Sequence, residues 1–266
     1  MTDRIRYELE GHVAKVTLAR AEKRNAFDLA MLRQLAEAYT RADDDDHVRA
    51  ILLCAEGAHF TAGLDLAEVG PAVASGWALF PADPVSGGSA LVDPLGLRGR
   101  VRKKPVVACV RGYCLTIGIE LALASDVVVA ADDTRFGQIE IKRGIFPFGG
   151  ATMRLPARAG WGNAMRWLLT GDLFDAAEAL RIGVAQEVTP PEAAPLRAME
   201  IATAIARAAP LGVQATLTSA RLAHLDGEVA AAAALLEQAR ALMGSADAAE
   251  GMRSFVERRD AVFTGR

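Results

Sequence analysis

Three short, uninterrupted apolar runs constrain the fold of this chain more than any other feature. They are "AILLC" at 50–54, "PVVACV" at 105–110 and "DVVVAA" at 126–131. Runs of this length without polar alternation are typical of strands that are buried on both faces, as in parallel sheets. The first two lead into a glycine-containing loop and then a helical pattern. This order predicts an α/β fold with its functional site in the loops that follow the strands.

Other segments follow simpler periodicities. "VAKVTL" at 13–18 alternates like a half-buried strand, and "FDLAMLRQLAEAYTRA" at 27–42 predicts an amphipathic helix with Asp28 as its N-cap. The acidic run Asp43–Asp46 is expected to form the helix end and a solvated turn. Residues 70–99 are rich in glycine, proline, serine and alanine, which predicts a mobile lid or a binding loop.

The last quarter of the chain has a different texture. From about residue 196 the sequence becomes rich in alanine and helical in periodicity. We therefore expect residues 1–195 to form the core that carries the site, and residues 196–266 to form a helical region that mediates assembly.

Composition narrows the class of protein. The 266 residues are 52% hydrophobic and 24% charged, with a net charge of −3, which is typical of a globular protein and does not require an anionic partner. No stretch approaches the roughly 20 apolar residues of a membrane helix, and the amino terminus lacks the apolar core of a signal peptide. We expect a cytoplasmic protein with no membrane association.

Several kinds of site are disfavoured. The three cysteines are too few and too uneven for a disulfide framework, and the four histidines are scattered, so no metal site is expected. The glycine motifs of serine hydrolases, phosphate-binding loops and dinucleotide-binding folds are missing.

One acidic residue stands inside an apolar segment. Glu120 lies in "YCLTIGIELALA", and a helix would place it on one face with Ile117, Leu121 and Ala124, with no cation nearby. An unpaired buried carboxylate is costly, so Glu120 is either a core residue satisfied by backbone amides or a residue that faces a substrate. Burial would also raise its pKa, as acid/base catalysis by a carboxyl group requires.

A second acid, Glu140, follows in "RFGQIEIKRGIFPFGG". Lys142 and Arg143 are close to it in sequence, so an exposed, ion-paired loop residue is the alternative to a catalytic one.

Two loops offer backbone amides to an anion. "HFTAGLDL" at 59–66 has small residues that let a ligand approach, and "RGYCLTIG" at 111–118 runs into the start of the Glu120 helix, where N–H groups are free. Two converging amides can stabilise a developing oxyanion, although each loop taken alone is also consistent with a simple turn.

Together these segments resemble the crotonase superfamily, which includes the enoyl-CoA hydratase/isomerase family. The resemblance rests on the order and spacing of five segments: "KRNAFDLAMLRQL" at 23–35, "HFTAGLDL" at 59–66, the run from "PVVACV" to "TMRL" at 105–155, "LLTGDLFDAAEALRIGVAQEV" at 168–188 and "EGMRSFVERR" at 250–259. It implies a spiral of repeated ββα units with a C-terminal helical region. Residues 1–195 would hold the CoA and acyl site, and 196–266 would build a homotrimer or a hexamer, a dimer of trimers.

The resemblance also implies a reaction. Its ligand would be an acyl-CoA of fatty acid metabolism, with coenzyme A as part of the substrate and no metal or redox cofactor. The N–H groups of Leu64 and Ile117 would bind the thioester carbonyl. Glu120 and Glu140 would flank the water that adds to the α,β double bond, with Glu140 as the acid and Glu120 as the base, a division that stays open.

Further residues match positions that contact the ligand. Those matching the CoA and acyl contacts are Lys23, Arg24, Ala26, Ala62, Asp65, Leu66, Trp77 and Phe148. Phe263 matches an aromatic residue that can reach the CoA of a neighbouring subunit.

The chain departs from the family at two motifs. The usual triple glycine is Thr116-Ile117-Gly118, so Ile117 can present its N–H only if its φ is negative. The usual Gln-Pro-Glu is Gln138-Ile139-Glu140, and bulky Phe146 and Phe148 follow it. These two rings are expected to shorten or reshape the acyl pocket. Trp77 and Phe80 are expected either to line it as well or to pack within their own apolar loop.

Other functions stay open. A double-bond isomerase, or another acyl-CoA reaction of the family, would reuse the same oxyanion hole, although retention of both glutamates favours hydration. The basic segment "RGRVRKK" at 98–104 raises RNA binding as an alternative, to which a solvated edge or a CoA-phosphate contact is preferred. A non-catalytic CoA-binding protein is the third alternative.

Overall fold

A six-stranded sheet forms the centre of the computed structural model, which describes residues 3–80 and 90–266. In spatial order its strands are β1 (Ile5–Glu10), β2 (Val13–Leu18), β3 (Ala50–Ala55), β4 (Val106–Val110), β6 (Val127–Ala131) and β9 (Glu187–Thr189). Only the β1–β2 pair is antiparallel among these strands. A second, three-stranded sheet comprises β5 (Tyr113–Leu115), β7 (Arg135–Gly137) and β8 (Phe174–Asp175).

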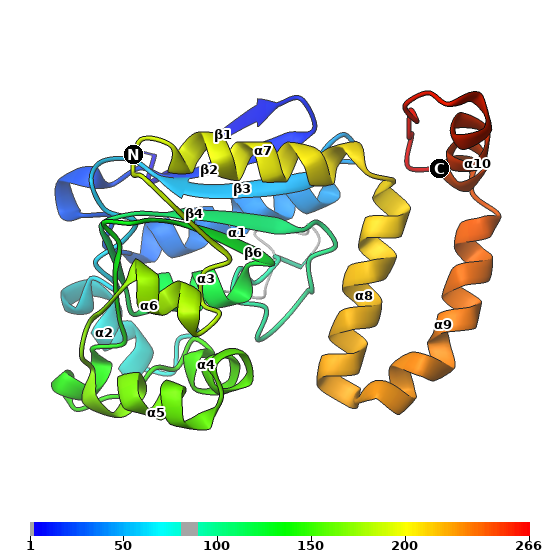
Figure 1. The fold of residues 1–266 in the computed structure, drawn as a ribbon. Coiled ribbons are helices and arrows are strands. Elements are labelled where there is room, and N and C mark those ends of the chain that lie inside the picture. Colours follow the sequence, from blue (N-terminus) through cyan, green and yellow to red (C-terminus); the bar gives the residue numbers. More distant parts are fainter. Residues whose placement is uncertain (1–2, 81–89) are drawn as a thin grey trace.

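The central sheet is buried on both faces, which explains the uninterrupted apolar runs. In β3, Ile51 and Leu53 face the main core, whereas Ala50 and Leu52 belong to a second core on the opposite face. Helix α7 (Ala194–Arg207) covers that second face with a row of alanines, and α1 (Leu29–Asp44) lies on the other side (Figure 1). The α/β prediction and the three predicted strands are therefore confirmed.

The remaining helices lie around the sheets and at the C-terminal end. They are α2 (Leu66–Ala74), α3 (Ile117–Ala124), α4 (Ala151–Ala159), α5 (Trp161–Thr170), α6 (Ala176–Arg181), α8 (Pro210–Asp226), α9 (Glu228–Met243) and α10 (Ala246–Glu257), with 3-10 turns η1 (Ala21–Lys23) and η2 (Glu140–Arg143). In the part of the chain that the structure describes, no helix combines the length and hydropathy needed to cross a bilayer.

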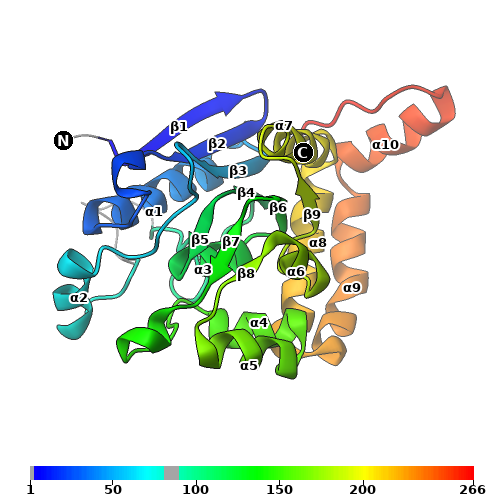
Figure 2. The same cartoon turned by 60° about the vertical axis from the view of Figure 1, so that its left-hand side comes forward.

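Helices α8 and α9 leave the core as an antiparallel pair, and α10 follows at the far end (Figure 2). No residue of α8 is fully buried, and large apolar side chains of these helices are exposed, including Leu225, Val229 and Phe255. Because α7 packs on the sheet, the helices that project from the core begin at residue 210. The division at residue 195 stays a prediction.

The acidic run Asp43–Asp46 contains the predicted helix end, since α1 ends at Asp44, and Asp44 and Asp46 are exposed, but Asp43 departs from the expectation. Asp43 does not lie in a solvated turn: its side chain is buried, accepts from Arg100 Nη2 at 2.6 Å, and also accepts from the N–H groups of Lys103 and Lys104. The acid thereby orders the loop that precedes β4.

The segment 70–99 packs partly on the core where the structure describes it, and the expectation of a mobile lid or a binding loop stays a prediction. Its first residues belong to α2, and its buried apolar side chains (Leu79, Phe80, Leu91, Val92 and Leu95) join the main core. Residues 81–89 of this segment lie outside the described residues.

Asp28 anchors the start of α1, and its removal should destabilise the fold. Its side chain accepts from the Met31 N–H at 2.8 Å and pairs with Arg4 and Arg20. We expect Asp28→Ala to lower the free energy of unfolding by about 1–2 kcal/mol in urea titrations. Asp28→Asn keeps the capping acceptor and should lose less. Equal losses in the two variants would show that the ion pairs, rather than the cap, stabilise this end.

Candidate active site

Three segments that follow strands meet around one small cavity of about 80 Å³. One lies between β3 and α2, one joins β5 to α3, and one extends from β7 through η2. The lining residues are Ala62, Leu64, Leu66, Thr116, Ile117, Glu120, Ile139, Glu140, Arg143, Ile145 and Phe148. The two glutamates and the two residues expected from the family resemblance to supply amides thus line one cavity, while their catalytic roles stay predictions.

Glu120 enters this cavity from the first turn of α3, a helix that is buried on all sides apart from its last residue. The side chain is 3% exposed, and its Oε1 accepts from the N–H of Gly149 at 2.6 Å and of Ala151 at 3.4 Å. These amides offset part of the cost of burying a carboxylate. Both readings left open by the sequence therefore hold: backbone amides satisfy Glu120, and it faces a cavity.

Glu140 is the first residue of η2, and it is buried as well. The alternative of an exposed, ion-paired residue was wrong, because Lys142 pairs instead with Asp172 at 3.2 Å. The buried amide of Gln138 lies against the acid. With its nitrogen turned toward Glu140, that amide donates to the two carboxylate oxygens at 2.9 and 3.0 Å. Gln138 therefore fixes the orientation of the Glu140 carboxyl group.

The environment places both acids in the pH range where catalysts exchange protons. Burial raises the pKa of Glu120 to about 7, against the opposing effect of the two amides and the Arg154 charge. Burial also raises the pKa of Glu140 to about 7, and the negative charge of Glu120 adds to that increase. One acid can thus be protonated while the other is ionised near neutral pH.

Two backbone N–H groups lie free at the same cavity. Within residues 3–80 and 90–266, neither Leu64 nor Ile117 donates its N–H to an acceptor. Ile117 is not among the residues with positive φ, so the replacement of glycine at this position leaves its N–H in place.

The unusual backbone conformation occurs at Thr116, the residue before Ile117. Thr116 has φ 50° and ψ −115°, a region that favours glycine. Its Oγ1 is buried without a hydrogen-bond partner and lies so close to Gly63 that a Cβ there would overlap it. The two amide-bearing loops are therefore packed directly against each other.

The expected CoA-contacting segment runs beside this site. Ala62 donates its N–H to the Arg24 carbonyl at 2.9 Å, and Phe27 pairs with Leu64 in a parallel bridge. Lys23 and Arg24 are exposed, and Ala26 follows them. Asp65, at the N-terminus of α2, pairs with Arg20 at 3.1 Å.

Trp77 is separated from the catalytic cavity by Phe148. Phe148 lines that cavity and also a neighbouring one of about 290 Å³, which Trp77 and Phe80 line as well. Phe146 is 61% exposed and lies outside both linings.

Phe263 is the predicted residue that this chain does not bring to the site. It lines a separate hollow with His12 and Arg49, and its carbonyl accepts from Arg49 Nη2 at 2.7 Å.

Sequence reasoning missed the residues that hold the acids. Gly149, Ala151 and Arg154 act on Glu120, and Gln138 contacts Glu140. The consecutive glycines 149 and 150 were the available signal, since a side chain at 149 would overlap the Glu120 carboxylate. Among the described residues, no group of three or more histidines, cysteines and acids is placed to hold a metal ion.

Comparison with known proteins gives one consistent result. The family described as enoyl-CoA hydratase/isomerase matches residues 8–266. The enoyl-CoA hydratase EchA19 of Mycobacterium tuberculosis is 34% identical over 97% of this chain and 96% of its own length. The 2,3-dehydroadipyl-CoA hydratase of Escherichia coli is 32% identical, covering 96% of each chain.

Solved structures agree with these relatives. A probable enoyl-CoA hydratase/isomerase from Mycobacterium abscessus superimposes with a TM-score of 0.93 at 48% identity, covering 99% of each chain. An enoyl-CoA hydratase from M. tuberculosis gives a TM-score of 0.86 at 33% identity, again covering 99% of each chain.

Gly149 should tolerate no side chain, because a Cβ would displace the Glu120 carboxylate from its amides. We expect Gly149→Ala to cost about 1–3 kcal/mol in the free energy of unfolding, measured in urea. Gly162→Ala is the matched control, since nothing lies within 4 Å of a Cβ at that helical position. A Gly149→Ala protein as stable as the control would contradict this packing.

The raised pKa values make stability depend on pH. The folded protein binds the Glu140 proton more tightly than the unfolded chain, where the pKa is near 4.5. This contribution is complete below pH 4.5 and is lost as the pH rises through about 7. Between pH 5 and 8, wild-type stability should therefore fall relative to Glu140→Gln, by on the order of 1–3 kcal/mol. Parallel pH profiles of the two proteins in urea titrations would refute the assignment.

Proposed function

Because this chain belongs to the enoyl-CoA hydratase/isomerase family and has the crotonase fold, we propose that it adds water across the α,β double bond of an enoyl-CoA thioester. The observation that carries this proposal is the meeting of two buried glutamates and two free backbone amides at one cavity. The enzyme is accordingly a hydro-lyase.

The two amides act on the thioester carbonyl. The N–H groups of Leu64 and Ile117 donate to its oxygen, whose negative charge grows as the enolate forms. Withdrawal of electrons toward that oxygen makes the β-carbon electrophilic. The donors are fixed in place before the reaction, so little reorganisation is needed when the charge develops.

The glutamates act on the water and the α-carbon. Glu120 Oε1 is occupied by amides, which leaves Oε2 to accept a proton from the water as its oxygen bonds to the β-carbon. Glu140 delivers its proton to the α-carbon. A new water then carries the proton from Glu120 to Glu140, which restores the starting state.

The surroundings of the acids support this division of roles. Amide donors and the Arg154 charge favour the ionised form of Glu120. Burial and the negative charge of Glu120 favour the protonated form of Glu140, against the Gln138 amide and a main-chain donor that favour its ionised form. Because the acids share one cavity, their titrations are coupled and the pH profile of the rate reports on the pair.

The cavities and loops around the glutamates indicate where the two parts of the substrate bind. The acyl chain passes Phe148 toward the 290 Å³ cavity beside Trp77, and the CoA portion lies along Lys23, Arg24, Ala26 and the 62–66 loop. The reaction proceeds without a metal or redox cofactor, and coenzyme A takes part only as a portion of the substrate.

A homotrimer, or a hexamer formed by two trimers, accounts for the apolar surface of the C-terminal helices. Val229, Phe255 and Val256 are each at least 80% exposed in the single chain. A neighbouring copy would cover such residues and would be needed for Phe263 to reach a CoA. The expected cytoplasmic location and a role in fatty acid metabolism stay predictions.

Other functions receive less support. Both acids flank the cavity, whereas an isomerase of this family usually keeps a single matching glutamate. The basic segment 98–104 forms no continuous stripe: Arg100 pairs with Asp43 and Asp44, and Arg102 with Asp126. These ion pairs turn two of its five cations away from an RNA phosphate backbone.

Replacement of either acid tests the hydratase mechanism. With crotonyl-CoA, followed by loss of the conjugated thioester absorbance, we expect Glu120→Gln and Glu140→Gln each to lower kcat about 100-fold or more. Asp172→Asn removes an exposed acid and should retain wild-type activity. A variant of either glutamate with full hydration activity would refute the two-acid mechanism, and no hydration by the wild type would refute the proposed function.

A further inference from the structure

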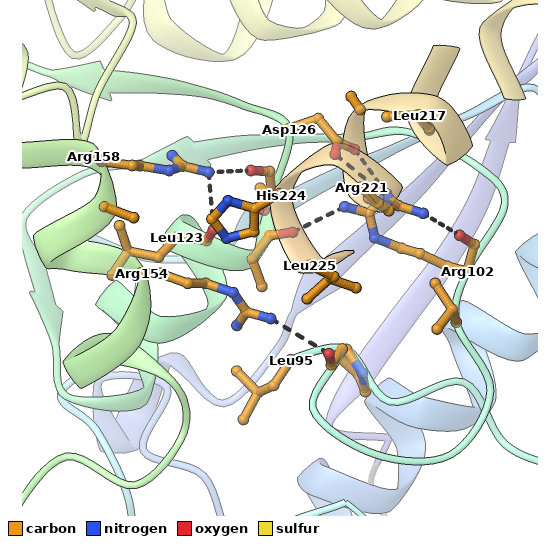
Figure 3. A pocket seen from close by; sticks show the side chains of 17 residues that line it. Leu95, Arg102, Leu123, Asp126, Arg154, Arg158, Leu217, Arg221, His224 and Leu225 are labelled. Atoms are coloured by element: carbon orange, nitrogen blue, oxygen red, sulfur yellow. Dashed lines mark hydrogen bonds and ion pairs between the residues drawn. The ribbon is translucent and has the colours of Figure 1, made fainter. Parts of the chain in front are cut away.

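A second, larger cavity lies on the other side of α3 from the catalytic one. Its volume is about 570 Å³, and it is formed where α8 approaches the core (Figure 3). The end of α3, the helix α4 and the loop from residue 94 to 102 complete its wall. It shares no lining residue with the catalytic cavity.

Positive charge is concentrated in this cavity. Figure 3 shows that guanidinium groups from the loop, α4 and α8 gather around it: those of Arg102, Arg154, Arg158 and Arg221. The acidic side chain in the described lining is Asp126, which pairs with Arg102 at 2.7 Å and Arg221 at 3.6 Å. Neither α4 arginine forms an ion pair with a carboxylate among the described residues, although Asp93 and Glu120 act on the Arg154 charge and Asp126 acts on that of Arg158.

Those two arginines keep unused donors. Arg158 uses Nη2 for the carbonyls of Leu123 and Ser125, both at 2.9 Å, and Arg154 uses Nη2 for the Gly96 carbonyl at 3.4 Å. Arg154 Nη1 also lacks a hydrogen-bond partner, but it is fully buried against Gly150 and does not open onto the cavity. The remaining N–H groups of these guanidiniums have no acceptor in residues 3–80 and 90–266, and a buried unsatisfied cation is costly.

The charges also act on one another. Burial lowers the pKa of Arg154, and the nearby Arg158 and Arg102 lower it further against the opposing effect of Asp93. Burial likewise lowers the pKa of Arg221, with Arg102 adding to the decrease. An anion placed among these groups would relieve both the desolvation and the repulsion.

Apart from Ser125 and His224, the rest of the wall is apolar. Side chains from the loop, α3 and α8 contribute Leu95, Val101, Leu123, Leu217 and Leu225. A simple inorganic anion would leave these surfaces in contact with water, whereas an anion with a short hydrocarbon chain would bury them.

We propose that this cavity binds an amphiphilic anion, whose carboxylate or phosphate head lies among Arg154, Arg158 and Arg221 and whose short apolar chain packs against the leucines. Guanidinium groups suit either head because each presents paired N–H donors to two oxygens. The site shares no lining residue with the one proposed for the thioester, although the Arg154 charge also acts on Glu120, and its occupation does not depend on the hydratase function.

Binding of defined probes to the full-length protein tests the proposal. Isothermal titration at constant ionic strength would compare hexyl phosphate, hexanoate, inorganic phosphate and hexanol. We expect hexyl phosphate or hexanoate to bind, with the better one identifying the head group, and hexanol not to bind. No binding of either amphiphilic anion would overturn the proposal, as would equal affinity for inorganic phosphate and hexyl phosphate.

Variants locate the binding. Arg221→Gln removes one cation, and Leu217→Glu places a carboxylate inside the cavity without removing an arginine hydrogen bond. Each should weaken binding of the preferred anion by about tenfold or more. Arg166→Gln, which removes an exposed arginine of α5, should bind like the wild type. Unchanged affinity in both cavity variants would place the anion elsewhere and overturn the assignment.

Discussion

The rest of the site depends on the burial of one carboxyl group on an apolar helix. Glu120 occupies the first turn of α3, where it forms no ion pair among the described residues, and the main-chain amides of Gly149 and Ala151, with the more distant Arg154 charge, stabilise its carboxylate. Amides stabilise the ionised form less than a salt bridge would, so the pKa stays near neutrality. The burial of Glu120 also constrains its neighbours. The backbone at glycines 149–150 has to approach the carboxylate closely, and Glu140 has to titrate next to the negative charge of Glu120.

Sequence patterns predicted several elements of the fold because burial restricts which residue types occur at each position of a strand or helix. Strands covered on both faces carry apolar residues at every position, which identified β3, β4 and β6, and the Asp28 cap fixed the beginning of α1. An acidic or loop-like composition predicted solvent exposure less reliably. Asp43 looked solvated because its partner, Arg100, lies 57 positions away, and burial of Leu91 and Val92 depends on contacts that their own segment does not reveal.

Only some of the residues of the candidate site could be predicted from the sequence. The apolar setting of Glu120 marked it as unusual, but nothing in local spacing placed Glu140 opposite it; the family resemblance supplied that expectation. The amides at 149–151, the amide of Gln138 and the strained backbone of Thr116 are tertiary features. A residue such as Thr116 breaks a local conformational preference, and it persists because the packed loops around it determine its backbone.

Helix α3 has different partners at its two ends. Its amino-terminal N–H of Ile117 opens onto the catalytic cavity, while the carbonyls of Leu123 and Ala124 are held by Arg158 and Arg102 in the second cavity. Eight residues span only about 12 Å. Over so short a distance a helix behaves nearly as a rigid rod, so a shift of its arginine-bound end would also move the free N–H of Ile117.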